Sequence, residues 1–324
     1  MNKMQQKLLD LKISEKLPFW AIAPLVIILV FVIVFAVTGA KTDAATGFGL
    51  GIDFTGGTEM TIMVEDSTKN EHTVIEILKD KGIHNVDYIQ GVTTGGQNGI
   101  RVQYKNVNSD ATKMKEINDS AKTALEEKFG VKVDYTNRSS TASADLIKKA
   151  FLSVGIALIL ILLYIIIRFE WLSGVAAVIA LLHDVFMMVC MTVICRIPVN
   201  SSFIAAIITI VAYSINNTII VFDRVRERKK QFDKNKIIYN EVADEAVAMT
   251  LNRTLFTSLT TLIMVIMLTA LGVVSMRHFT LPILFGLVAG TYSSMFLAAP
   301  LWASMQNGIL RYRAKQYAKY KAMK

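Results

Sequence analysis

Residues 18–38 read PFWAIAPLVIILVFVIVFAVT, a run without a single charged side chain. A helix needs about 20 predominantly apolar residues to cross the hydrocarbon core of a membrane. The run is also longer than the apolar core of a cleaved signal peptide, which is about 7–15 residues, so we expect it to persist as a membrane-spanning helix. Five further apolar runs follow at residues 150–167, 171–195, 199–222, 252–274 and 279–304.

The composition of the whole chain agrees with six membrane-spanning helices. Of its 324 residues, 53% are hydrophobic and 19% are charged, and the mean hydropathy is +0.43. Soluble domains carry about 25% charged residues. These values exclude a soluble cytoplasmic enzyme and a disordered or fibrous chain. They predict an α-helical polytopic membrane protein.

Lysine and arginine are distributed unevenly between the two sides of this predicted bundle. Eighteen of them lie in a tail at 1–17, at Arg168, in a loop at 223–251 and in a tail at 305–324, whereas the two short loops on the other side carry only Arg196 and Arg277. This bias predicts a cell-membrane protein with both termini in the cytoplasm. Anionic lipids are the expected partner of the basic segments, so the net charge of +9 requires no nucleic acid.

Two features of the 223–251 loop predict local structure. Residues 237–251 place apolar and acidic side chains on opposite helical faces, which predicts an amphipathic cytoplasmic helix on the membrane or on a partner. Asp223 and Arg224 stand where the fourth span meets the cytoplasm, and we expect a boundary cap or a salt bridge to the basic loop.

Residues 39–146 form the single long loop, and the charge bias places it outside the cell. It holds 12 basic and 16 acidic residues, unlike the rest of the chain. Strand patterns at 58–64, 86–92, 100–104 and 131–136 alternate with helical patterns at 72–81 and from a cap at Ser109 to Gly130. The order β-α-β-β-α-β predicts one external α+β domain of the ferredoxin-like type.

No catalytic or metal-binding constellation accompanies this fold. We find no metal-ligand spacing and no nucleophile with its base in residues 39–146, and the two cysteines, Cys190 and Cys195, lie in an apolar run. The glycine-rich stretch 47–58 (GFGLGIDFTGGT) fits neither a dinucleotide fingerprint nor a phosphate-binding loop. We therefore expect no enzyme activity and no cofactor, and a binding or lever-like role for the external domain.

Polar side chains inside the predicted spans are the remaining candidates for function, because they are costly in a membrane and mark ion paths or interhelical contacts. His183 and Asp184 lie in the third span, with Asp184 about 20 Å along the helix and so near the membrane centre. Asn216 and Asn217 lie in the fourth span. Two interpretations of Asp184 stay open: a protonatable relay group, or a buried hydrogen-bonded anchor between helices.

Several motifs, in order along the chain, resemble one family. The first is GIDFTGGT, with Gly51, Asp53, Phe54, Gly56 and Gly57. Then come RFEW at 168–171, ALLHDV at 180–185, YSINNT at 213–218, VFDRVRE at 221–227 with Asp223 and Arg224, TLNRT at 250–254, TSLTT at 257–261, GTYSS at 290–294 and AAP at 298–300. With the same six-span plan, they resemble the SecF branch of the SecD/SecF protein-export family.

The resemblance implies a fold and a set of partners. A SecF chain looks like half of a transporter of the resistance-nodulation-division type, and SecD supplies the other half. The pair associates with the SecYEG channel and uses the proton gradient, or sodium in some relatives, to help pull a translocating preprotein through on the outer side. ATP belongs to the separate SecA motor, which is therefore only an indirect partner.

The resemblance also bears on the ion-pathway candidates Asp184, Asn217, Arg253, His183 and Asn216. The position of Asn217 is commonly aspartate in the family, and an amide cannot exchange a proton. The path would then use Asp184, a carboxylate of SecD or another ion, or coupling would be lost. Arg253 aligns with an arginine of the family's ion path and would pair with the relay carboxylate; the alternative is a residue that snorkels at the interface.

Two other functions stay open. The same half-transporter plan would suit export of a small molecule or lipid. A structural partner of the translocon without ion coupling is the second, and Asn217 keeps it open.

Overall fold

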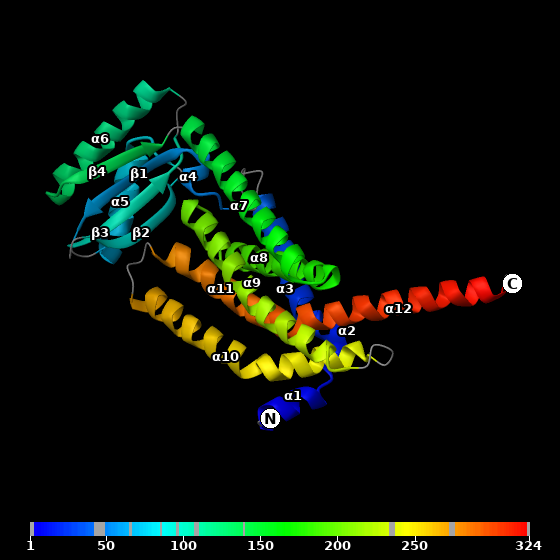
Figure 1. Ribbon diagram of the computed structural model, residues 1–324. Helices are drawn as coiled ribbons and strands as arrows, with labels where there is room; N and C mark the ends of the chain where they lie inside the picture. Colours follow the sequence, from blue (N-terminus) through cyan, green and yellow to red (C-terminus); the bar gives the residue numbers. More distant parts are fainter. Residues whose placement is uncertain are drawn as a thin grey trace.

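The computed structural model describes residues 3–41, 49–64, 67–84, 86–94, 97–106, 110–138, 140–232, 237–271 and 276–322. Six helical stretches in these ranges are long and apolar enough to span a membrane: Ile13–Val37, Asp145–Ile165, Trp171–Ile194, Ser201–Lys229, Tyr239–Leu271 and Arg277–Lys321. The predicted class, six spans plus one α+β domain, is confirmed. Figure 1 shows the α+β domain at one end of the bundle and both chain ends away from it.

The α+β domain lies between the first two spans. Its elements are α4 (Ile52–Thr55), β1 (Gly57–Met63), α5 (Ser67–Asp80), β2 (Val86–Thr94), β3 (Gln97–Tyr104), α6 (Ala111–Phe129) and β4 (Val133–Arg138). The described strands pair antiparallel in the order β2-β3-β1-β4, as the β-α-β-β-α-β order predicted. Buried apolar side chains of both helices pack on the sheet to form its core, among them Met60, Leu78, Ile100, Val102 and Leu125.

One predicted boundary in this domain is corrected. Asp110 takes the N-cap position of α6, where its side chain accepts a hydrogen bond from the backbone N–H of Thr112. The predicted cap, Ser109, lies outside the described residues. Both residue types favour this position, so sequence alone left the start of α6 uncertain by one residue. Gly130 ends the helix in a left-handed conformation, as expected.

A buried polar chain ties α6 to the sheet. The hydroxyl of Tyr104 donates to Asn118 Oδ1 at 2.7 Å, and Asn118 Nδ2 donates to Thr58 Oγ1 at 3.1 Å. All three residues are fully buried, and burial raises the pKa of the Tyr104 hydroxyl. Because each buried polar group has a partner, this chain fixes the position of α6 without leaving an unsatisfied donor.

A second tyrosine on this helix–sheet interface gives a pH prediction. Tyr135 donates a 2.7 Å hydrogen bond to the Asp119 carboxylate, which raises the pKa of Tyr135 from 10.0 to about 12. The unfolded chain then ionises first, so the stability from this pair is complete below pH 10 and is lost between pH 10 and about 12. Titration of tyrosinate absorbance should find this late ionisation, and in Asp119→Asn it should move back toward 10.0. An unchanged titration in Asp119→Asn would contradict the assigned cause.

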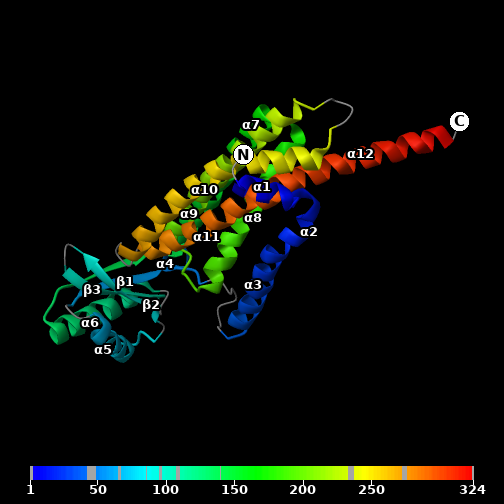
Figure 2. The same ribbon diagram turned by 90° about the horizontal axis from the view of Figure 1, so that it is seen from below.

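The membrane part contains the remaining helices. The chain enters through α1 (Lys3–Asp10), the 3-10 turn η1 (Ile13–Lys16), α2 (Leu17–Trp20) and α3 (Ile22–Lys41), and after the α+β domain continues with α7 (Ser140–Arg168), α8 (Trp171–Ile194), α9 (Ser201–Lys229), α10 (Tyr239–Leu271), α11 (Arg277–Ser293), the π-helical turn η3 (Ser294–Ala298) and α12 (Ala299–Ala322). Helices α8, α9 and α11 pack together in the middle, and α3 packs on α8 at the edge of the bundle (Figure 2).

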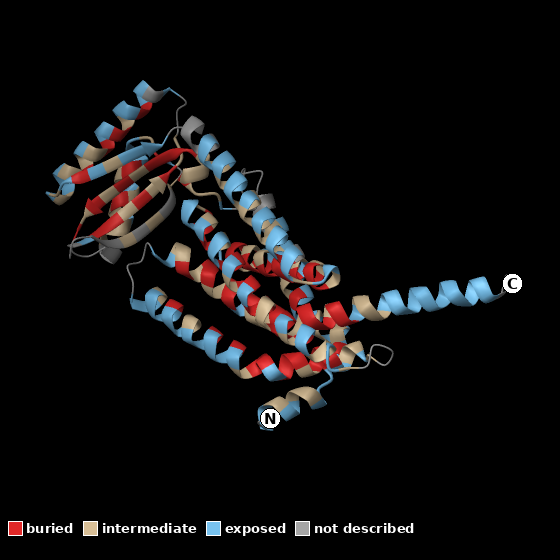
Figure 3. Cartoon of the chain, viewed as in Figure 1, coloured by how far each residue is buried: buried red, intermediate tan, exposed pale blue. Residues whose placement is uncertain are grey.

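Burial separates the inner helices from the outer ones. Figure 3 shows buried residues concentrated in the centre of the bundle and in the sheet, whereas α7 and the distal part of α12 are largely exposed. On α7 the exposed side chains are apolar, for example Phe151 at 74% and Ile167 at 85% exposed. Such a face fits contact with lipid or with another membrane helix.

The predicted amphipathic helix at 237–251 is part of a longer helix. It is continuous with the fifth span in α10, and its apolar residues Val242, Ala243 and Ala246 are fully buried beside Trp302 of α12. The sequence left the membrane or a partner open as the surface beneath this helix, and for Val242, Ala243 and Ala246 that surface is α12 of the same chain. Figure 1 shows that α10 bends along its length.

Candidate functional site

Asp184 is the centre of a buried polar cluster in the bundle. It lies on α8 and is fully buried. Its Oδ2 accepts a hydrogen bond from Ser214 of α9 and another, at 2.7 Å, from Ser293 of α11. Asp184 therefore joins the three central helices through hydrogen bonds from a hydroxyl group on each of the other two.

Close approach of the helices at this point depends on Gly290 of α11. A Cβ atom at Gly290 would lie 3.3 Å from Ser214 Cβ and 3.5 Å from Asp184 Oδ2. Ser293 follows three residues later and directly precedes η3. Small residues at such contacts let backbones approach, and π-helical turns often occur at functional sites.

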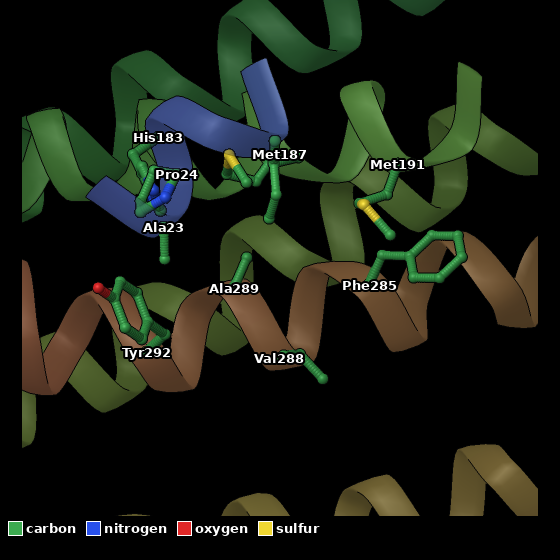
Figure 4. A pocket seen from close by; sticks show the side chains of 10 residues that line it. Ala23, Pro24, His183, Met187, Met191, Phe285, Val288, Ala289 and Tyr292 are labelled. Carbon is green, nitrogen blue, oxygen red and sulfur yellow. The ribbon is translucent and has the colours of Figure 1, made fainter. Parts of the chain in front are cut away.

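His183 completes the cluster on the side of α3. Its Nδ1 lies 2.9 Å from Asp184 Oδ1, while its Nε2 is buried with no hydrogen-bond partner among the described residues. The imidazole lines a cavity of about 240 Å³ between α3, α8 and α11, where Figure 4 shows it beside Ala23 and Pro24. The other lining side chains include Met187 and Tyr292. His183 thus connects Asp184 to an otherwise largely apolar cavity.

Asn217 lies one helical turn beyond Ser214 on α9. Its side chain is 1% exposed, and neither its amide nitrogen nor its oxygen has a hydrogen-bond partner within the described part of the chain. An unsatisfied buried amide costs about 1–3 kcal/mol. The neighbouring Asn216 faces the outside of the bundle and is exposed.

Arg253 does not join Asp184. It lies near the middle of α10 with an exposed side chain, and no ion pair links it to a carboxylate in the described ranges. The predicted pairing of Arg253 with a relay carboxylate is therefore not formed inside this single chain. The helix α10 begins before the predicted fifth span, so a place near the middle of α10 agrees with a place at the start of that span.

Hydroxyl groups connect α10 to the central helices on the opposite face from α3. Tyr213 of α9 and Thr291 of α11 each donate a 2.9 Å hydrogen bond to Ser258 of α10. These two hydrogen bonds fix the position of α10 along α9 and α11.

The glycine-rich stretch connects the α+β domain to α9. Gly51 N–H donates to Val199 O at 2.8 Å, and Val199 N–H donates to Gly49 O at 2.8 Å. Asp53 Oδ2 accepts from the backbone N–H of Ser201, at 3.0 Å, and from its hydroxyl, at 2.7 Å, at the first turn of α9. Gly47 and Phe48 lie outside the described residues.

Asp53 also forms an ion pair with the last strand of the domain. Its Oδ1 pairs with Arg138 at 3.0 Å, at the end of β4 and close to the start of α7. Gly57 permits this tight exit: its φ is 155°, and a Cβ there would lie 2.5 Å from the Tyr104 carbonyl oxygen. Through these contacts the stretch joins the α+β domain to the start of α9 and to the end of β4.

The remaining signature residues lie at the far end of α9. Asp223 pairs with Arg168 at 3.3 Å, and Arg224 pairs with Glu227. Asp223 thus forms a salt bridge to the end of α7 rather than to the basic loop. Phe54, like Leu50, packs against the apolar cluster near the start of α9.

The sequence pointed to Asp184 but missed the hydroxyl partners that make it a site. Ser214 is 30 residues away and Ser293 is 109 residues away. One feature of the sequence could have pointed to Ser214. It lies three residues before Asn217, so the two side chains are neighbours on one face of the same helix.

Comparison with known proteins places the chain in a family. Residues 118–308 match the family model Protein export membrane protein SecD/SecF, C-terminal, and residues 44–68 match the SecD/SecF GG Motif. The chain is 34% identical to Protein translocase subunit SecF of Sebaldella termitidis over 79% of its own length and 81% of the relative's. It is 33% identical to the same subunit of Helicobacter pylori strain 26695, over 78% and 76%.

Fused relatives are longer. The chain covers 35% of Protein translocase subunit SecDF of Bacillus subtilis, at 34% identity over 81% of its own length. The crystal structure of SecDF, a translocon-associated membrane protein from Thermus thermophilus, superposes with a TM-score of 0.72 and 29% identity, over 91% of this chain and 38% of that one. These relatives are membrane transport components rather than catalytic enzymes. The chain belongs to the SecD/SecF family of protein-export membrane proteins, and within it corresponds to the SecF subunit.

Proposed function

We propose that this chain pairs with a SecD chain and uses an ion gradient to promote late steps of protein export on the side of its α+β domain. Asp184, buried between three helices and bonded to Ser214, Ser293 and His183, is the observation that carries the proposal. The ion is a proton, with sodium as the alternative. Both termini are cytoplasmic in this proposal, and the passing cargo is a preprotein in the SecYEG channel.

Asp184 supplies the chemistry that Asn217 lacks. As a carboxylate it accepts hydrogen bonds from both serines and from the imidazole N–H. When it gains a proton, its own O–H needs an acceptor, so at least one of the three donors must turn or leave. Hydrogen bonds to a charged group are worth about 1.5–3 kcal/mol each, enough to shift helix packing between two states.

His183 gives protons a path to this carboxylate. A proton that binds Nε2 from the cavity side allows Nδ1 to release its proton to Asp184 Oδ1, 2.9 Å away. The imidazole then returns to its first tautomer by rotation or by proton exchange. The unpartnered Nε2 beside the 240 Å³ cavity supports this direction of transfer.

The change at Asp184 reaches the α+β domain through α9. Ser214 is on this helix, and Ser201 at its first turn is held by Asp53. The two points are about 20 Å apart along the helix. A shift of α9 against α8 and α11 would therefore displace the joint that carries the external domain.

The exposed polar residues on α9 and α10 support pairing with SecD. Charged side chains within membrane spans are costly and almost always pair with another group or face the interior of a bundle. Arg253 and Asn216 are both exposed in this chain, and Asn217 is buried without a partner among the described residues. A carboxylate of SecD facing Arg253 would satisfy it and complete the ion path.

The test is completion of preprotein translocation in vesicles that contain this chain, SecD and SecYEG, after SecA and ATP have started it. We expect an imposed proton gradient to raise completion for the wild type. We expect no rise for Arg253→Met and a normal rise for Arg311→Met, which removes an exposed arginine of α12. If neither a proton nor a sodium gradient affects the wild type, the coupled function is wrong and a structural role in the translocon remains.

A further inference from the structure

Besides the apolar cavity next to His183, the structure has a strongly basic cleft. It lies at the end of the bundle that is far from the α+β domain. It has a volume of about 590 Å³ and lies between the α7–α8 junction and the end of α9. Its lining contains four cationic side chains, Arg168, Arg226, Lys229 and Lys230. The acidic side chain in the lining is Glu170.

Two of the four cations pair with a carboxylate among the described residues. Lys229 Nζ lies 2.8 Å from Glu170, and Arg168 lies 3.3 Å from Asp223. Arg226 and Lys230 are exposed, and neither forms an ion pair with a carboxylate in the described ranges. They are spaced i, i+4 at the end of α9, so they repel each other across one turn. The helix macrodipole favours cations at this end, but it does not explain why these two face a common cleft.

The rest of the lining is apolar and continues onto a membrane-facing surface. Ile167, Phe169, Phe232 and Ile237 line the same cleft. Ile167 is 85% exposed and ends a row of exposed apolar side chains on α7 that includes Leu160, Leu163 and Tyr164. A phospholipid needs a cationic site for its phosphate and an apolar surface for its acyl chains, and the cleft and the adjacent face of α7 supply both. A free phosphate would use the cationic site alone.

We infer that this cleft binds the headgroup of an anionic phospholipid. The phosphodiester lies between Arg226 and Lys230, with Arg168 and Lys229 at its edge, and an acyl chain runs along the exposed face of α7. The site is at the membrane level of the α7 and α8 ends, where basic recesses between helices recognise anionic headgroups. It is separate from the Asp184 cluster and does not depend on ion coupling.

Trp171 provides a local probe of lipid at this site. It directly follows the cleft residue Glu170, starts α8 and is 68% exposed. The full chain is reconstituted in vesicles in which either phosphatidylglycerol or phosphatidylcholine carries brominated acyl chains. The measured quantity is the quenching of Trp171 fluorescence, taken as the part of the total quenching that is lost in Trp171→Phe. Its value with each brominated lipid gives the relative affinity for the two lipids.

We expect the wild type to prefer phosphatidylglycerol at Trp171. The double variant Arg226→Gln/Lys230→Gln should lose this preference by roughly ten- to thirtyfold, since each cation near an anionic surface contributes a factor of about five. Arg311→Gln/Lys315→Gln removes the same charge from the exposed part of α12 and should retain it. Native mass spectrometry of both variants should report retained phosphatidylglycerol in the same order, and unchanged thermal unfolding shows that each folds.

Three results would overturn the inference. The first is equal quenching by both lipids in the wild type, which would indicate that the cleft binds an acidic protein segment instead of a lipid. The second is an equal loss in both double variants, which indicates a general surface charge effect. The third is loss of the preference on adding soluble inorganic phosphate at the same ionic strength, which makes the site one for free phosphate.

Discussion

Asp184→Asn is expected to abolish the gradient-dependent part of translocation while the protein still folds. The side chain keeps its shape, and its amide oxygen still accepts a hydrogen bond from Ser214 or Ser293. The amide cannot bind or release a proton, so the hydrogen bonds between α8, α9 and α11 no longer change with the gradient. The residual mismatch of donors costs about 1–3 kcal/mol, which a membrane bundle of this size tolerates.

The measurement is completion of translocation with and without a proton gradient, in vesicles with equal amounts of folded protein. Asp223→Asn is the matched control, because it neutralises an exposed carboxylate on α9 that pairs with Arg168. We expect the control to respond to the gradient as the wild type does and Asp184→Asn to stay at the level without a gradient. A full response in Asp184→Asn would show that Asp184 is only an anchor.

Asp53→Ala is expected to remove most of the gradient stimulation from a different place. The change deletes both hydrogen bonds to Ser201 and the ion pair with Arg138. Asn200 still caps α9, and the two lost hydrogen bonds and one half-buried ion pair each cost on the order of 1 kcal/mol, so both domains should still fold. The cluster around Asp184 is unchanged, but only the backbone hydrogen bonds between the glycine-rich stretch and Val199 remain of the contacts described above, so less of a movement of α9 reaches the α+β domain.

Two further variants separate transmission from general damage. Asp53→Asn keeps an oxygen that can accept from Ser201 and should recover much of the stimulation. Glu59→Ala removes a partly exposed carboxylate that pairs with Arg101 at 3.4 Å within the sheet, and should behave as the wild type. If Asp53→Ala retains the full stimulation, the joint is a passive tether.

The sequence predicted most of the architecture because each element carries its own periodicity. Six apolar runs predicted the six spans, and the alternation of strand and helix patterns predicted the topology of the α+β domain. At 237–251 the sequence predicted an amphipathic helix on the membrane or on a partner, but it did not show that the apolar face packs against Trp302 of α12 in the same chain. An amphipathic pattern shows that one face is covered, but not by what.

The site was less predictable because it depends on contacts between distant segments. Asp184 could be chosen from its depth in the third span, but Ser214 and Ser293 become its partners only when α9 and α11 pack against α8. Arg253 was chosen by resemblance, and the single chain leaves it exposed. For the glycine-rich stretch the sequence spoke only against a phosphate-binding loop, and the hydrogen bonds of Asp53 to Ser201 required the structure.

A proton gained or lost at Asp184 is expected to move the α+β domain relative to the bundle. Single-molecule energy transfer between Lys115→Cys on α6 and Arg311→Cys on α12, in a background without Cys190 and Cys195, measures this movement. The protein is reconstituted with SecD in vesicles, with and without a gradient. We expect the gradient to populate a second distance in the otherwise wild-type protein, but not in Asp184→Asn. One unchanged distance in both proteins, or the same shift in both, would show that Asp184 does not move the domain.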